Sequence, residues 1–120
     1  MNNKVFIASA LLLVMVGAHA AERSLTCKNI ITADNQIRPY HLKVTEHKDG
    51  SVEVNSPKTN ILTNGWSDQN HSEWTSVGTL EDGKDYSVVV IKHDSGFDVH
   101  YLHDYTMTTA VDCKTHGNWN

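Results

Sequence analysis

After the first twenty residues, apolar and polar side chains alternate along most of the chain, and turn-forming residues recur at roughly ten-residue intervals. An apolar period of two is typical of half-buried β-strands, and the sequence is rich in Val, Ile, Thr and Tyr but poor in proline. No segment keeps the 3.6-residue period of an amphipathic helix. We therefore expect strands at residues 25–32, 40–47, 51–55, 60–63, 73–80, 86–93, 97–103 and 105–113.

Turn residues predict the register of the first hairpin. The Lys-Asp-Gly segment 48–50 fits a three-residue loop with its glycine in the left-handed conformation. Pairing His47 with Ser51 then places Val44 opposite Val54 and gathers the apolar side chains on one face. A two-residue loop would scatter them, because a shift of one residue turns every side chain to the other face.

The Asp-Ser-Gly segment 94–96 is expected to form a second loop of the same kind, pairing His93 with Phe97. The core face of this hairpin would consist of Val89, Ile91, Phe97, Val99 and Tyr101. The opposite face would carry Val88, Val90, His100 and Leu102. Residues 81–84 suit a two-residue Asp-Gly turn flanked by a Glu–Lys pair.

Cys27 and Cys113 lie near the two ends of the predicted sheet and are the only cysteines in the sequence. Pairing them would close a loop of 86 residues. The predicted fold is all-β: a small antiparallel barrel of seven or eight strands, or a two-sheet sandwich, with a disulfide between the first and last strands. Bringing these two strands together would also remove exposed sheet edges.

The first twenty residues are typical of a signal peptide. Residues 5–17 are almost entirely apolar but too short to span a bilayer, and small residues at 18 and 20 favour cleavage before Ala21. We expect residues 21–120 to form a single exported β domain, periplasmic or secreted. A bacterial envelope is favoured over a eukaryotic source, because the start is short and weakly basic and the domain is small.

The net charge limits the kinds of partner. Loss of Lys4 with the signal peptide leaves nine basic and fourteen acidic side chains, a net charge of −5. An acidic surface is not attracted to nucleic acid or to an anionic membrane, so neither is expected as a partner, and no segment is predicted to span a membrane.

The sequence contains no motif of a common enzyme or metal site. Seven histidines remain after cleavage, but none lies in a His-Glu-x-x-His or paired Cys-x-x-Cys arrangement. His100 with Asp98 is the best candidate for a metal site, although solvated or hydrogen-bonded histidines are the simpler interpretation. We expect no catalytic residues, no metal and no cofactor.

Two features favour binding to another protein. The first is the connection at residues 56–72, which carries Ile61, Leu62 and Trp66. Trp66 would either anchor a partner or fold back to plug one end of the barrel. The second feature is the face that carries Val90, His100 and Leu102, which would be a docking surface unless the 56–72 connection covers it.

The exported size, all-β pattern and terminal cysteines resemble the periplasmic and membrane-bound inhibitors of c-type lysozyme. Those inhibitors are small barrels that insert a Ser-Gly-containing loop into the lysozyme cleft. The matching residues here are Ser95 and Gly96 after Asp94, without the surrounding family pattern. We assign no family and transfer no site.

Taken together, these patterns predict a non-catalytic binding protein of the bacterial envelope. It would dock to another protein as an inhibitor or an immunity-type antagonist. The alternative is a periplasmic β-barrel that binds a small ligand or a metal ion.

Overall fold

The structure is a computed structural model that describes residues 21–120, so the predicted signal peptide lies outside the described residues. The all-β prediction is confirmed, because this part of the chain forms nine antiparallel strands and no helix. It therefore also contains no helix that could cross a membrane. The strands are β1 (Arg23–Ile31), β2 (Ile37–Glu46), β3 (Val52–Asn55), β4 (Asn60–Thr63), β5 (Asp68–Gln69), β6 (Glu73–Thr79), β7 (Asp85–His93), β8 (Gly96–His103) and β9 (Thr106–His116).

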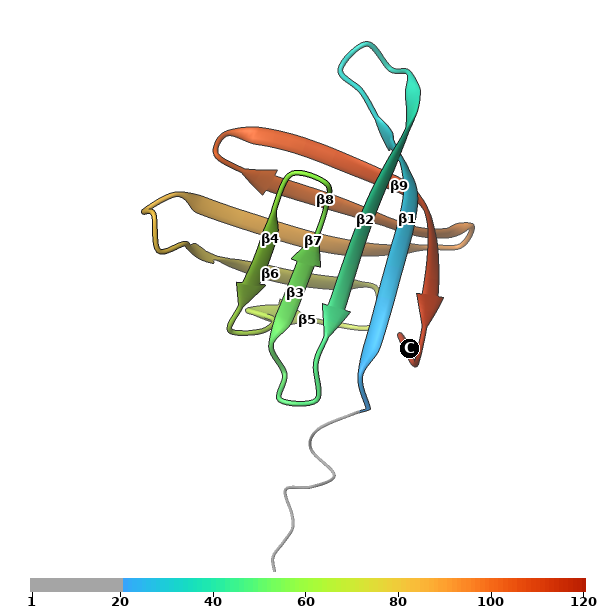
Figure 1. Ribbon diagram of the computed structural model, residues 1–120. Helices are drawn as coiled ribbons and strands as arrows, with labels where there is room; N and C mark the ends of the chain where they lie inside the picture. The colour runs from blue at the N-terminus through green and yellow to red at the C-terminus, as the bar shows by residue number, and fades with distance from the viewer. Residues whose placement is uncertain (1–20) are drawn as a thin grey trace, which may run out of the picture.

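The strands form one continuous curled sheet in the order β4-β3-β2-β1-β9-β8-β7-β6-β5. Strands that follow one another in the sequence pair with each other, except β4 and β5, and β1 also pairs with β9. In Figure 1, strands β1–β4 cross in front of strands β6–β9, so the sheet curls over on itself as a half-barrel. β4 and β5 lie at its two edges.

The disulfide lies in the ladder that joins the two ends of the chain. Cys27 in β1 is directly opposite Cys113 in β9, and their sulfur atoms are bonded as predicted. Disulfides persist in oxidising compartments, so the bond indicates an extracytoplasmic environment.

The first hairpin has the predicted register. The backbone N–H of His47 donates to the carbonyl of Ser51 at 2.8 Å, and Val44 lies opposite Val54. Gly50 has a φ of 91°, in the left-handed region that glycine tolerates. The three-residue loop is therefore confirmed.

The predicted register of the second hairpin is wrong by one residue. His93 pairs with Gly96 rather than with Phe97, which leaves a two-residue loop, and Gly96 has a φ of 143°. Because of this shift, Val88 and Val90 face the core, and Val89 and Ile91 face outward. The turn at residues 81–84 also differs from the prediction, because Leu80 pairs with Lys84 across a three-residue loop.

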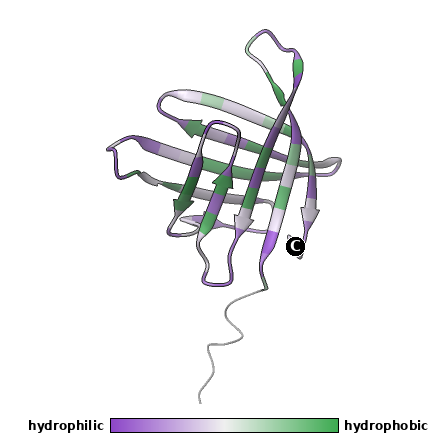
Figure 2. Cartoon of the chain, viewed as in Figure 1, coloured by the Kyte–Doolittle hydropathy of each residue, from purple (hydrophilic) through white to green (hydrophobic). Residues whose placement is uncertain are grey.

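The core lies inside the half-barrel, where apolar side chains from alternate strand positions meet; Figure 2 shows apolar and polar residues alternating along the strands. Its main members are Leu25, Leu42, Val44, Val52, Val54, Ile61, Trp74, Tyr86, Val88, Val90, Val99, Tyr101, Ala110 and Trp119.

One end of the half-barrel is closed by a cluster that we call the aromatic plug: Trp66, Trp74, Phe97 and Trp119 around Arg23. The ring centres of Trp74 and Trp119 are 5.2 Å apart, and the Arg23 guanidinium lies 4.4 Å from the Trp119 ring centre. Arg23 also forms a 2.8 Å ion pair with Glu46. The C-terminal segment thus packs back onto the domain.

Candidate functional site: a cleft along the free edge of β4

Strand β4 has an unpaired edge. The Ser56 N–H donates to the Thr59 carbonyl at 2.8 Å, so these two residues form a hydrogen-bonded pair at the β3–β4 turn. Along the antiparallel ladder that follows, non-hydrogen-bonded and hydrogen-bonded pairs alternate. By that alternation, the backbone N–H and C=O groups of Asn60 and Leu62 point away from β3. No strand within residues 21–120 pairs with this side of β4, so these groups form a free edge.

The facing edge, on β6, is also incompletely paired. The short strand β5 pairs only with Trp74 and Thr75, which leaves the later part of β6 without a ladder partner on this side. Side chains bridge the gap at two neighbouring points. Ser76 Oγ lies 2.8 Å from the Gly65 carbonyl and 3.1 Å from Thr63 Oγ1, and the Val77 N–H donates to Ser67 Oγ at 3.1 Å. The wall of the half-barrel is therefore open beyond these bridges.

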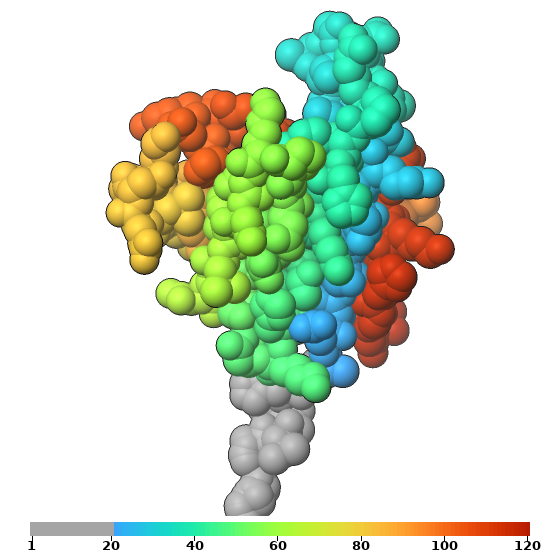
Figure 3. All heavy atoms as spheres, viewed as in Figure 1, coloured from blue at the N-terminus to red at the C-terminus, as the bar shows by residue number. Residues whose placement is uncertain are grey.

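A cleft follows this opening. It is lined by residues 59–64 on one side and by residues 79–82, Tyr86 and His103 on the other. Figure 3 shows the hollow between the green β4 and the gold β6–β7 turn. The leucine at 62 has 64% of its surface exposed here, and Glu81 and Asp82 supply acidic side chains without a Lys or Arg among the lining residues.

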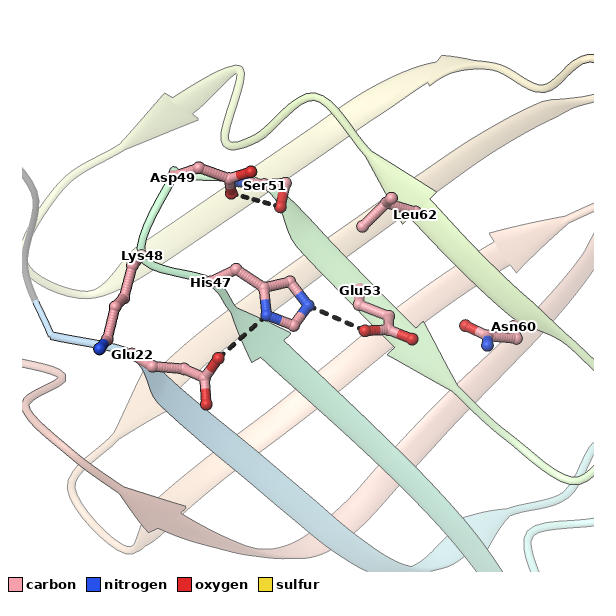
Figure 4. A pocket seen from close by; sticks show the side chains of 8 residues that line it. All are labelled: Glu22, His47, Lys48, Asp49, Ser51, Glu53, Asn60 and Leu62. Atoms are coloured by element: carbon pink, nitrogen blue, oxygen red, sulfur yellow. Dashed lines mark hydrogen bonds and ion pairs between the residues drawn. The ribbon is translucent and has the colours of Figure 1, made fainter.

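A second depression surrounds His47, at the end of β2 (Figure 4). Its Nδ1 lies 3.0 Å from Glu22 Oε2 and its Nε2 lies 2.8 Å from Glu53 Oε1. The hydrogen bonds to Glu53 and then to Glu22 raise the pKa of His47, and the bond to His47 lowers the pKa of Glu53. Because both ring nitrogens face carboxylates, the cluster forms a charged clamp and leaves no nitrogen for a metal ion.

This clamp predicts a pH-dependent stability. A raised folded-state pKa means that protonated His47 stabilises the fold below its unfolded pKa, and that this stability is lost as pH rises through the folded pKa. The lowered pKa of Glu53 adds stability that is lost as pH falls through its own folded pKa. The contribution of these partly exposed pairs to the free energy of unfolding should be largest between the ordinary pKa of Glu and the ordinary pKa of His. It should stay below roughly 1 kcal/mol.

We expect His47→Gln to flatten the alkaline side of this profile, measured by urea unfolding at a series of pH values. His71→Gln, at an exposed histidine outside the clamp, is the matched control and should keep the wild-type profile. A His47→Gln variant that loses stability with rising pH as steeply as the wild type would contradict the assignment.

The structure separates the residues that were predicted to bind a partner. Leu62 lies on the cleft, Ile61 is 4% exposed in the core beside it, and Trp66 is half-buried in the aromatic plug. The indole N–H of Trp66 donates to Glu46, the arrangement expected if Trp66 plugs the barrel. A partner-binding role for Leu62 and Trp66 stays a prediction.

The second predicted patch is not one surface. Val90 is fully buried in the core, whereas His100 and Leu102 are partly exposed on the outer face of β8. The one-residue shift of the hairpin is the reason, because it turns β7 over relative to β8. The prediction that these three side chains share a face is therefore wrong.

The candidate metal residues lie in a different setting. Asp98 Oδ2 lies 3.0 Å from His93 Nε2, so the partner of Asp98 is His93 and not His100. Within residues 21–120, no group of three or more His, Cys, Asp or Glu side chains is arranged to hold a metal ion.

The sequence predicted the strand at residues 60–63 but did not predict that one edge of this strand is unpaired. The pattern of side chains does not say whether a strand has one neighbour or two. The only available signal was the short connection between β4 and β5, which is too short to contain a full pairing strand.

No known protein-family model matches the chain, and no characterised protein or solved structure shows significant similarity to it. The function proposed below is therefore inferred from the geometry of the half-barrel.

Proposed function

We propose that this protein binds an extended segment of another protein along the free edge of β4. It would act without catalysis, as an inhibitor or an immunity-type antagonist in the periplasm or outside the cell. The observation that supports this proposal is the row of outward-facing backbone groups at Asn60 and Leu62 beside an open cleft. An added strand would pair with those groups, which is a common mode of peptide recognition.

The composition of β4 supports this role. Proteins usually protect an edge strand with lysine, proline, a bulge or an inward-pointing charge. The four residues of β4, Asn-Ile-Leu-Thr, include none of these, and their ladder with β3 is regular. Edge β5 at the other end of the sheet is only two residues long and offers little to pair with.

The side chains around the cleft favour a particular kind of segment. Glu81 and Asp82 on the β6–β7 turn lie opposite β4, and the exported chain is acidic overall. An extended segment that carries a lysine or arginine would complement this charge. The exposed Leu62 would contact an apolar side chain of the segment, because neighbouring positions on paired strands meet on the same face.

The decisive experiment removes the backbone donor without altering the β3–β4 ladder. Leu62→Pro deletes an N–H that points to the open edge, where proline is tolerated. Leu62→Thr changes the side chain and keeps the N–H, so it is the matched control. Immobilised wild type and both variants would be exposed to an extracytoplasmic extract of the source cells, and the retained protein identified and purified for titration.

We expect Leu62→Pro to weaken binding of that purified protein by at least about tenfold, the equivalent of one lost hydrogen bond. Leu62→Thr should change the affinity much less. In hydrogen exchange, the amides of Asn60 and Leu62 should exchange rapidly in the free protein and become protected in the complex. If both variants bind like the wild type and these amides stay unprotected, the β4 edge is not the binding site.

A further inference from the structure

The loop that follows β4 contains the only Asn-Gly pair of the sequence, Asn64-Gly65. Asn64 is exposed, lies in a bend directly after the end of β4, and lines the β4 cleft. Asparagine is one of the chemically labile residues of proteins, because its side-chain amide can react with the backbone nitrogen of the next residue. The pair therefore places a reactive group beside the proposed binding site.

The fold favours glycine at position 65 for two reasons. Gly65 has a φ of 132°, a conformation that residues with a side chain rarely adopt. A Cβ atom built on Gly65 would also lie 2.8 Å from the backbone carbonyl oxygen of Gly50, in the β2–β3 loop. The close approach of these two loops thus disfavours every residue with a Cβ atom, and the nitrogen that follows Asn64 has no neighbouring side chain to shield it.

The backbone around this nitrogen is held unevenly. The Gly65 N–H donates to Thr63 Oγ1 at 3.3 Å, longer than the usual N–H···O hydrogen bond. The Gly65 carbonyl accepts a shorter bond, 2.8 Å, from Ser76 Oγ. The loop is therefore anchored through the peptide group after Gly65, while the peptide group between Asn64 and Gly65 is held only weakly.

Other asparagines are in less reactive settings. Every other asparagine that has a following residue precedes one with a side chain, which hinders attack by the backbone nitrogen. The side-chain amides of Asn29, Asn55 and Asn70 also take part in hydrogen bonds that hold them in place. Asn64 is therefore the position where the reaction should occur first.

From these observations we propose that Asn64 is a site of spontaneous deamidation in the folded protein. The Gly65 nitrogen loses its proton to hydroxide and attacks Asn64 Cγ. The new C–N bond closes a cyclic imide, and the side-chain nitrogen takes up a proton and leaves as ammonia. Water then opens one of the two C–N bonds of the ring, which leaves aspartate or isoaspartate at position 64 and consumes no oxidant or reductant.

The product changes the charge of the β4 cleft. Deamidation adds a carboxylate to a lining that already contains Glu81 and Asp82. A more acidic cleft would favour a basic segment further, if such a segment binds there. The reaction itself needs no partner, so this inference goes beyond the proposed function and does not depend on it.

The test incubates the disulfide-bonded protein in buffer and in urea, at neutral and at mildly alkaline pH. Ion-exchange chromatography follows the acidic product, and mass spectrometry of proteolytic peptides locates the changed residue. We expect position 64 of the folded protein to deamidate at least about tenfold faster than any other asparagine. The rate should rise with the hydroxide concentration, because the attacking nitrogen must lose its proton.

Asn64→Gln should stop formation of the acidic product, because the longer side chain closes a ring far more slowly, and should keep the wild-type urea midpoint. Asn70→Gln, at an exposed asparagine that is held by hydrogen bonds, is the matched control and should react like the wild type. The proposal is overturned if the folded protein keeps asparagine at position 64 after the chain in urea has lost it. It is also overturned if Asn64→Gln forms the acidic product as fast as the wild type.

Discussion

Replacing Cys27 and Cys113 together by serine is expected to lower the free energy of unfolding by about 4 kcal/mol. The bond joins positions 86 residues apart, so it removes a large amount of chain entropy from the unfolded state. It also holds β1 against β9, the two strands whose pairing brings the ends of the chain together. Against a typical total of roughly 5–15 kcal/mol, this loss would leave a weakly folded domain.

The measurement is urea unfolding of the wild type, the double-serine variant and the reduced wild type. The reduced wild type is the control, because it breaks the same bond without placing serine hydroxyls in a buried position. Both should lose a similar free energy of unfolding. A loss below roughly 1 kcal/mol in the reduced protein would show that the β1–β9 ladder holds the half-barrel closed without the disulfide.

Trp119→Ala is expected to lower the free energy of unfolding by about 3–5 kcal/mol, the usual cost of removing a large buried aromatic side chain. Trp119 is 4% exposed, and its ring packs edge-on against Trp74 and under the Arg23 guanidinium. Its indole N–H also donates to the Ser24 carbonyl at 3.0 Å. The substitution therefore opens a cavity and removes the hydrogen bond to the partly buried Ser24 carbonyl.

Thermal and urea unfolding would measure this effect. Asn120→Ala, at the exposed neighbouring position, is the matched control and should unfold like the wild type. Trp119→Phe should lie between the two, because it refills part of the cavity without restoring the N–H. If Trp119→Ala were as stable as Asn120→Ala, the C-terminal segment would not be part of the core in solution.

The first hairpin was predictable because two independent signals agree. Where β2 and β3 pair, the apolar side chains Val44, Val52 and Val54 occupy one face, so only one register buries them together. The glycine at position 50 also suits the left-handed site of a three-residue loop. Strand positions elsewhere were predictable for a similar reason, since alternation and turn residues are local properties of the chain.

The second hairpin was not predictable on the same grounds. Strand β7 is apolar on both faces, so either register buries a row of valines. The glycine at position 96 fits a two-residue loop as well as a three-residue one, and packing inside the half-barrel decided between them. The loss of Val90 from the predicted surface patch follows directly from this ambiguity.

The sequence alone determined that the chain forms antiparallel strands joined by tight turns, with its two cysteines available to join the first and last of them. These are local consequences of side-chain alternation, turn chemistry and residue content. Only the tertiary structure decided that β4 keeps a free edge and that Trp66 packs into a plug. The physical reason is that pairing and burial depend on which strands become neighbours across the curled sheet, and side-chain alternation is the same in every such arrangement.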